Sequence, residues 1–215
     1  FEDFDKVIFY GAGMCGYAAA AFSVVAPGAT VIAVSPQASL ARDLTEWDTR
    51  FEGTRRMDFT SRYGFAPDML EAAEAAYIVY DPDEVEDAMH AALFRGSNIF
   101  KHRYRRGRSG AIDADLRTMG LISRLCEVAV NGYLTPVQLA RKMRARRRHM
   151  PYLRALLARV IAEDRPYLTA LLCRSVLADR PIPRFRHHLE AAENRLKEQG
   201  RALPGQSAGA DTNVG

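Results

Sequence analysis

The fold is decided by Val7-Ile8-Phe9-Tyr10-Gly11-Ala12-Gly13-Met14-Cys15-Gly16-Tyr17-Ala18-Ala19, close to the start of the sequence. Four apolar residues are typical of a buried strand, a glycine-rich stretch follows, and the alanines after it favour a helix. A strand, a glycine-rich turn and a helix at this spacing indicate one of two structures. One is a loop that holds a phosphate group, and the other is a sharp turn that presents a catalytic nucleophile. The two interpretations predict different functions.

The first half of the sequence alternates strands with helices. The apolar run at residues 29–34 is uninterrupted, which is typical of a strand buried on both faces of a parallel sheet. Alternation of such strands with helices predicts an α/β fold, in which a parallel sheet has flanking helices. The expected strands are residues 6–10, 29–34, 76–80 and 97–102, and the expected helices are residues 14–25, 68–76 and 84–94.

The second half of the sequence is helical. Thr135-Pro136-Val137-Gln138 has the residues of a helix start, with a threonine cap and a proline at the first helical position. We therefore divide the chain into an α/β core over residues 1–110, a helical region over residues 111–200 and a tail over residues 201–215. The tail is rich in glycine and alanine, and we expect it to be disordered.

The composition indicates a globular protein of the cytoplasm. Hydrophobic residues make up 48% of the 215 residues, and no apolar run is long enough to span a membrane. The three cysteines are widely spaced and odd in number, which favours reduced thiols over a disulfide or a metal site. Since no cysteines and histidines have the spacing of metal ligands, we expect neither a metal ion nor a cofactor.

Gly11, Gly13 and Gly16 satisfy the pattern G-x-G-x-x-G of nucleotide-binding loops, in which backbone N–H groups and a helix N-terminus attract phosphate. Such loops need a second element, an acidic residue at the end of the next strand that binds the ribose. That position falls in Ser35-Pro36-Gln37, which contains neither an acid nor an arginine. The pattern is therefore incomplete, and a Rossmann-type nucleotide-binding protein is the alternative hypothesis.

Residues 10–19 fit the second interpretation better. They resemble Tyr-Gly-x-Ser-Met-Gly-Gly-Tyr-x-Ala, the nucleophile turn in a group of bacterial α/β-hydrolase-fold proteins of poorly defined role. The resemblance covers residues 5–125 and implies an α/β-hydrolase-like sheet. The other matching positions are residues 27–31 and 35–37, Tyr80-Asp81-Pro82, and the pair Asp87 and His90.

The resemblance also identifies the catalytic residues that are missing. Gly13 occupies the serine position, Ala111 falls at the histidine position, and Asp81 stands at the acid position, where it also fits a turn. Without a nucleophile and a base, the chain cannot carry out acyl transfer of this kind. A residue with a Cβ at the nucleophile turn is strained by about 1–3 kcal/mol, and glycine at position 13 removes this strain. The resemblance therefore implies a pseudoenzyme that acts as a binding or assembly module. Its candidate binding residues are Gly11, Gly13, Met14 and Gly16.

An active, esterase-like hydrolase with non-standard residues is the third hypothesis. Cys15 is the candidate nucleophile, but helical geometry turns it about 200° from position 13, into the packing between helix and sheet. His90 and His102 are candidate bases. His90 follows Asp87 by three residues on a polar helix face, where we expect a solvated or locally paired side chain.

The family's sheet has strands before the nucleophile turn that this sequence does not contain. The strand at residues 6–10 is therefore expected to form an exposed apolar edge, which promotes aggregation unless it is covered. We expect an N-terminal portion, a partner chain or self-association to cover it.

The positive charge of the chain, +4 in total, is concentrated in two clusters. The first comprises Arg103, Arg105, Arg106 and Arg108, and the second comprises Arg141, Lys142, Arg144, Arg146, Arg147 and Arg148. A solvated helix face is the ordinary role of such a run, and the alternatives are a surface for nucleic acid, acidic lipid or an acidic protein. The second cluster is the candidate site for an anionic partner.

Overall fold

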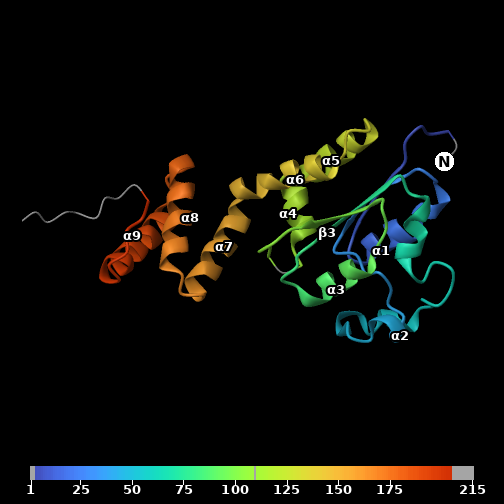
Figure 1. Ribbon diagram of the computed structural model, residues 1–215, viewed down its shortest axis with the longest axis horizontal. Coiled ribbons are helices and arrows are strands. Elements are labelled where there is room, and N and C mark those ends of the chain that lie inside the picture. The colour runs from blue at the N-terminus through green and yellow to red at the C-terminus, as the bar shows by residue number, and fades with distance from the viewer. Residues whose placement is uncertain (1–2, 109, 205–215) are drawn as a thin grey trace, which may run out of the picture. The chain divides into compact units, whose positions relative to one another are not determined.

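The computed structural model describes residues 3–108 and 110–204 (Figure 1). The described residues form two compact units, with the boundary between Tyr152 and Leu153. The first unit contains the sheet and the helices around it, and the second unit is helical. Among the described residues, no helix combines the length and the apolar character that crossing a membrane requires.

The first unit is built on a four-stranded parallel sheet whose strands follow one another in chain order. The strands are β1 (Ile8–Ala12), β2 (Thr30–Val34), β3 (Ala75–Tyr80) and β4 (Ile99–Arg103). The predicted α/β class with a parallel sheet is therefore confirmed. β2 is buried along its whole length, as its uninterrupted apolar sequence predicts, and β1 lies at one edge of the sheet.

One face of the sheet is covered by α1 (Met14–Ala21), the 3₁₀ helix η4 (Ala66–Ala72) and α3 (Val85–Leu93). Alternate residues of each strand point to this face because the side-chain period of a strand is two. The helix expected at residues 68–76 is thus a 3₁₀ helix that ends before β3 begins. The buried side chains on this face include Ala20, Ala21, Val31, Ala33, Leu70, Ala76, Ile78, Tyr80, Ala91 and Phe94.

The segment between β2 and β3 is mostly irregular before it reaches η4. Before η4, this segment contains three short helical turns, α2 (Arg42–Thr45), η2 (Thr49–Phe51) and η3 (Thr54–Arg56). Another short turn, η1 (Ser23–Val25), follows α1.

The opposite face carries α4 (Ile112–Thr118), α5 (Leu121–Val130), α6 (Pro136–Met143) and the 3₁₀ helix η5 (Arg144–Arg148). Tyr77 of β3 joins the sheet to this layer, because its ring stacks on Phe100 and its hydroxyl donates to the carbonyl of Leu134. Thr135 caps α6 as predicted, since its side chain accepts from the backbone N–H of Gln138. The first unit therefore includes helices that the sequence places in a separate region from residue 111 onward.

The second unit contains most of α7 (Met150–Ala162), together with α8 (Pro166–Asp179) and α9 (Pro183–Glu198). α8 and α9 pack around Ala170, Ala192 and Leu196. Leu203 of the predicted tail is buried in the same cluster, whereas Arg201, Ala202 and Pro204 are exposed. The rest of that tail, residues 205–215, lies outside the described residues.

Candidate functional site

The turn between β1 and α1 has the backbone geometry of a sharp strand-to-helix bend. Gly13 adopts φ 55° and ψ −126°, values of the first central residue of a type II′ turn, which glycine occupies without strain. A Cβ placed on Gly13 meets no atom within 4 Å, so a side chain here would point into open space. The position therefore has room for a side chain but carries none.

The neighbouring glycines are explained by close packing. A Cβ on Gly11 would lie 2.0 Å from the carbonyl oxygen of Cys15, because the first turn of α1 passes directly over the end of β1. A Cβ on Gly16 would lie 3.2 Å from Pro36 and from the carbonyl of Gly11. The three glycines of the motif thus serve the strand–helix contact, whether or not a phosphate binds.

A pocket of about 290 Å³ opens beside Gly13 at the carboxyl ends of the strands. In parallel α/β sheets this is the edge at which ligands bind. Of the four predicted binding residues, Gly13 lines the pocket and the other three do not. The lining residues are Ala12, Gly13, Val34, Ser35, Gln37, Arg50, Phe51, Glu84, Asp87, Gly110, Ile112 and Asp113.

The positions predicted for the acid and the base lie in one region of the fold. Asp81 follows β3 and is buried, and its carboxylate accepts from the backbone N–H groups of Asp83 at 3.0 Å and Gly107 at 2.8 Å. Asp81 therefore contacts the loop after β4 through the backbone amide of Gly107, and not through a side chain at the predicted histidine position. Ala111 caps α4 in that same loop, next to Gly110 at the pocket. Neither Gly13 nor Ala111 supplies a titratable group.

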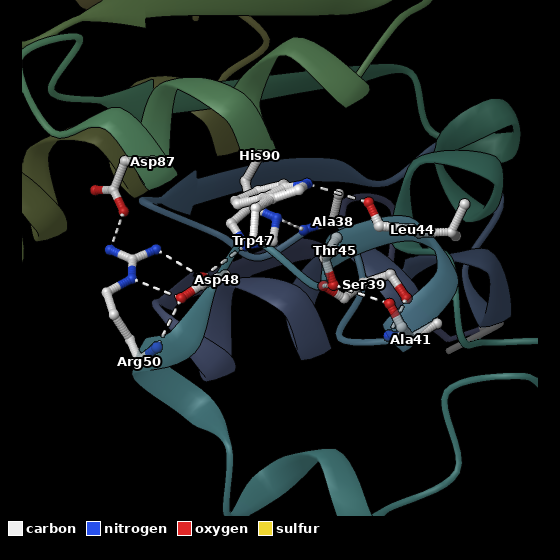
Figure 2. Close-up of polar contacts among 10 residues, drawn as sticks. All are labelled: Ala38, Ser39, Ala41, Leu44, Thr45, Trp47, Asp48, Arg50, Asp87 and His90. Atoms are coloured by element: carbon white, nitrogen blue, oxygen red, sulfur yellow. Dashed lines mark hydrogen bonds and ion pairs between the residues drawn. The ribbon is translucent and has the colours of Figure 1, made fainter.

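Arg50 lines the pocket, and Figure 2 shows that two carboxylates hold its guanidinium. Its guanidinium donates to both carboxylate oxygens of Asp48, at 3.0 and 2.9 Å, and to Asp87 at 2.8 Å. Burial alone would raise the pKa of Asp48, but hydrogen bonds from Arg50 and His90 outweigh it and lower the pKa to about 2. Asp48 therefore stays ionised and fixes the direction in which Arg50 points.

His90 is fully buried, and Asp48 lies between it and Arg50 (Figure 2). Its Nδ1 accepts from the backbone N–H of Ala38 at 3.2 Å, so Nε2 carries the proton and donates to Asp48 at 2.9 Å. Burial lowers the pKa of His90 despite the neighbouring carboxylate, which keeps the ring neutral. The expectation of a solvated or locally paired histidine is wrong, because this face of α3 is covered by the segment after β2. With both nitrogens engaged, His90 cannot serve as a base.

The expected orientation of Cys15 is also wrong, because Cys15 is exposed. Gly13 lies outside the helical region of backbone space, so α1 begins only at Met14 and angles counted from position 13 do not apply. His102 lies on β4, three strand spacings from β1, about 14 Å away. Its buried Nε2 has no hydrogen-bond partner among the described residues. The candidate nucleophile and this candidate base are therefore not brought together.

The charged residues of the pocket were not predicted as site residues. Arg50, Glu84 and Asp113 come from segments far apart in sequence, and none belongs to a motif. Besides Gly13, the sequence marked Ser35 and Gln37, at the end of the next strand where a ribose-binding acid was sought, and Asp87, which matches the resembled family. Gln37 lines the pocket and is almost fully buried. Within residues 3–108 and 110–204, no three histidine, cysteine or carboxylate side chains are grouped as a metal site would require.

The second basic cluster lies on α6 and η5 and does not form one uniform surface. Arg141, Arg144, Arg147 and Arg148 are exposed, and Lys142 is partly buried. Arg146 is partly buried, with its guanidinium over the rings of Tyr104 and Tyr152. Comparison with known protein families, curated proteins and solved structures found no match to this chain.

Proposed function

We propose that this chain is a non-catalytic α/β-hydrolase-like protein that acts as a binding or assembly module. The observation that carries the proposal is Gly13, whose backbone has the bend of a nucleophile turn and whose missing side chain would face open space beside the pocket. A turn of this kind without its hydroxyl keeps the ligand pocket and loses the covalent step.

The order of the strands favours this proposal over a nucleotide-binding protein. In a Rossmann sheet the fourth strand lies beside the first, and the dinucleotide binds where the order reverses. Here β4 pairs with β3, and the order β1-β2-β3-β4 has no reversal. The N–H of Gly13 donates to the carbonyl of Val34 at 2.9 Å, so it is not free for a phosphate.

The open edge of β1 supports a role in assembly. Val7 and Gly13 bond to β2, and in a parallel ladder the backbone groups of alternate residues face opposite sides. The N–H and C=O groups of Ile8, Tyr10 and Ala12 therefore face away from β2, ready to pair with another strand. A partner chain or a second copy covers this edge in our proposal, and a strictly monomeric native mass over a wide range of concentration would contradict it.

The cysteines favour a cytoplasmic location as part of the proposal. Cys15, Cys126 and Cys173 are all free, and Cys15 is exposed. Exposed free thiols persist in a reducing compartment.

Catalysis is tested with p-nitrophenyl esters and a fluorophosphonate probe for activated serines. We expect no turnover above the uncatalysed rate and no labelling of the wild-type chain. Turnover that is abolished by Asp81→Asn and retained by Cys15→Ala would overturn the proposal, because it would require a working acid position.

Binding is tested by NMR, with a fragment library added to the isotope-labelled full chain. We expect amide shifts to gather at Gly13, Gln37 and Gly110 around the pocket. Ile112→Trp, which fills the pocket, should abolish these shifts, while Ile161→Trp on the exposed side of α7 should leave them unchanged. Shifts spread evenly over the protein in both variants would argue against a ligand pocket.

A further inference from the structure

Two arginine-rich segments, far apart in sequence, are anchored on one buried carboxylate. Asp115 of α4 has no exposed surface, and its Oδ1 accepts from the Arg108 guanidinium and from His149 Nε2 at 3.1 Å. Arg108 ends the first segment, residues 103–108, and His149 directly follows the second, residues 141–148. Asp115 therefore brings the two segments together in the first unit.

A second link joins the same segments. The guanidinium of Arg146 lies 4.8 Å from the ring centroid of Tyr104 and 5.3 Å from that of Tyr152. It also donates to the carbonyl of Arg105 at 3.3 Å. Through these contacts, Arg146 holds the loop after β4 against η5. Its guanidinium is therefore not available to a ligand, unlike those of the exposed arginines around it.

Six other arginines of these segments are exposed. In the described part of the chain, no ion pair connects any of these six to another residue. Three of them recur at a spacing of three residues along α6 and η5, which places them in one row. We call these six residues the arginine surface: Arg103, Arg105, Arg106, Arg141, Arg144 and Arg147.

The chemistry of the arginine surface favours phosphates on a polymer. Planar guanidinium groups bind phosphate oxygens in pairs. Insertion into a membrane needs apolar side chains beside the charges, and a protein interface needs an apolar centre. The large apolar residues within the two segments, Tyr104 and Met143, are both buried. Val137, one helical turn before Arg141, and Tyr133 are exposed, but they are two separate side chains and lie on one side of the second segment only. A nucleic acid requires neither apolar side chains beside the charges nor an apolar centre, because its backbone supplies a row of phosphates.

We propose that the arginine surface binds nucleic acid through the phosphate backbone, without sequence specificity. Base stacking needs exposed aromatic rings, and the two segments present none, because Tyr104 is buried. This inference rests on residues outside the pocket and is independent of the proposed function.

The test measures fluorescence anisotropy with a labelled single-stranded RNA of about 20 nucleotides, longer than most single-strand sites. Six phosphate contacts predict that log K falls with log salt with a slope of about −4, from roughly 0.7 per contact. Arg105→Glu/Arg144→Glu/Arg147→Glu should weaken binding at least tenfold and reduce the slope by about 2. The neutral set Arg105→Gln/Arg144→Gln/Arg147→Gln should weaken it less, in the same direction.

The control reverses three exposed basic residues of the second unit, Arg184→Glu/Arg186→Glu/Lys197→Glu, and so changes the net charge by the same amount. We expect this variant to bind RNA like the wild type. Equal loss in both charge-reversed variants would overturn the proposal, because the attraction would then be diffuse. No binding at low salt, or binding to phosphatidylserine vesicles but not to RNA, would overturn it as well.

Discussion

His90 Nε2 and Asp48 Oδ2 lie 2.9 Å apart, and neither side chain has any exposed surface. The pair joins α3 to the irregular segment after β2, and through Asp48 it also directs Arg50 to the pocket. The geometry of the pocket wall thus depends on a neutral histidine, and this dependence makes the stability of the fold sensitive to acid.

The free energy of unfolding should fall when the pH is lowered from 7 to 5. The folded-state pKa of His90 is below its ordinary value of 6.5, mainly through burial, so the unfolded chain binds more protons as the pH falls. Urea titrations at several pH values measure the slope, to which His90 contributes at most about 1.4 kcal/mol per pH unit. His90→Gln should flatten the profile, and an unchanged profile in this variant would contradict the assignment.

Asp48→Asn should destabilise the protein by about 2–3 kcal/mol at neutral pH, because the charge-assisted hydrogen bonds from Arg50 and His90 are weakened. The pKa of Asp48 is lowered from 3.8 to about 2, so its contribution is present above pH 4 and disappears toward pH 2. Asp43→Asn, an exposed change in the same segment, is the control and should have little effect. Similar losses in both variants would argue against the buried network.

Alanine substitutions should rank the glycines of the first turn. Gly11→Ala should cost about 3 kcal/mol or more, since its Cβ would overlap the carbonyl of Cys15. Gly13→Ala should cost about 1–3 kcal/mol from its positive φ alone. Gly53, outside this turn, has an ordinary φ of −64°, and a Cβ there would meet no atom within 4 Å, so Gly53→Ala should be neutral or stabilising. Chemical denaturation measures all three, and the reverse order for Gly11 and Gly13 would refute the packing argument.

Iodoacetamide should label Cys15 of the native protein before the other two thiols. Cys15 is exposed, whereas burial raises the pKa of Cys126 and raises that of Cys173 to about 11. Peptide mass spectrometry after brief labelling distinguishes the three sites. Faster labelling of Cys173 would show that the exposure of these residues is misassigned.

Arg146→Ala should destabilise the first unit by about 1–2 kcal/mol, because it removes two aromatic contacts and a hydrogen bond to Arg105. Its neighbour Arg147 is exposed, and Arg147→Ala should change stability by less than about 0.5 kcal/mol. Thermal unfolding of the two variants provides the comparison. Equal effects would mean that Arg146 is as solvated as the rest of the cluster.

Features that depend on neighbouring residues were predictable. The apolar runs that form β2 and β3 are continuous, and the cap at Thr135 lies within four residues of its partner Gln138. Contacts between distant segments were not predictable, because no periodicity relates Asp48 to His90. The same holds for Asp115, whose two partners lie on opposite sides of it in sequence.

The candidate site was only partly predictable for the same reason. Gly13 was identified from its motif, and it does line the pocket. Arg50 and Glu84 come from segments that fold against the end of the sheet, and their sequences carry no signature of that position. The error at Cys15 came from extending helical geometry through a residue whose φ is positive.

The strictly consecutive order of the strands has a consequence for how the chain acquires its structure. Each strand from β2 to β4 pairs with the strand that precedes it in the sequence, and no strand is inserted between two strands that precede it. Such nearest-neighbour pairing keeps the sequence separation of the paired strands lower than a rearranged strand order would, and so reduces the entropy lost in closing the loops between them. The four described strands can therefore pair one after another, from β1 towards β4, without rearranging a pair that has already formed.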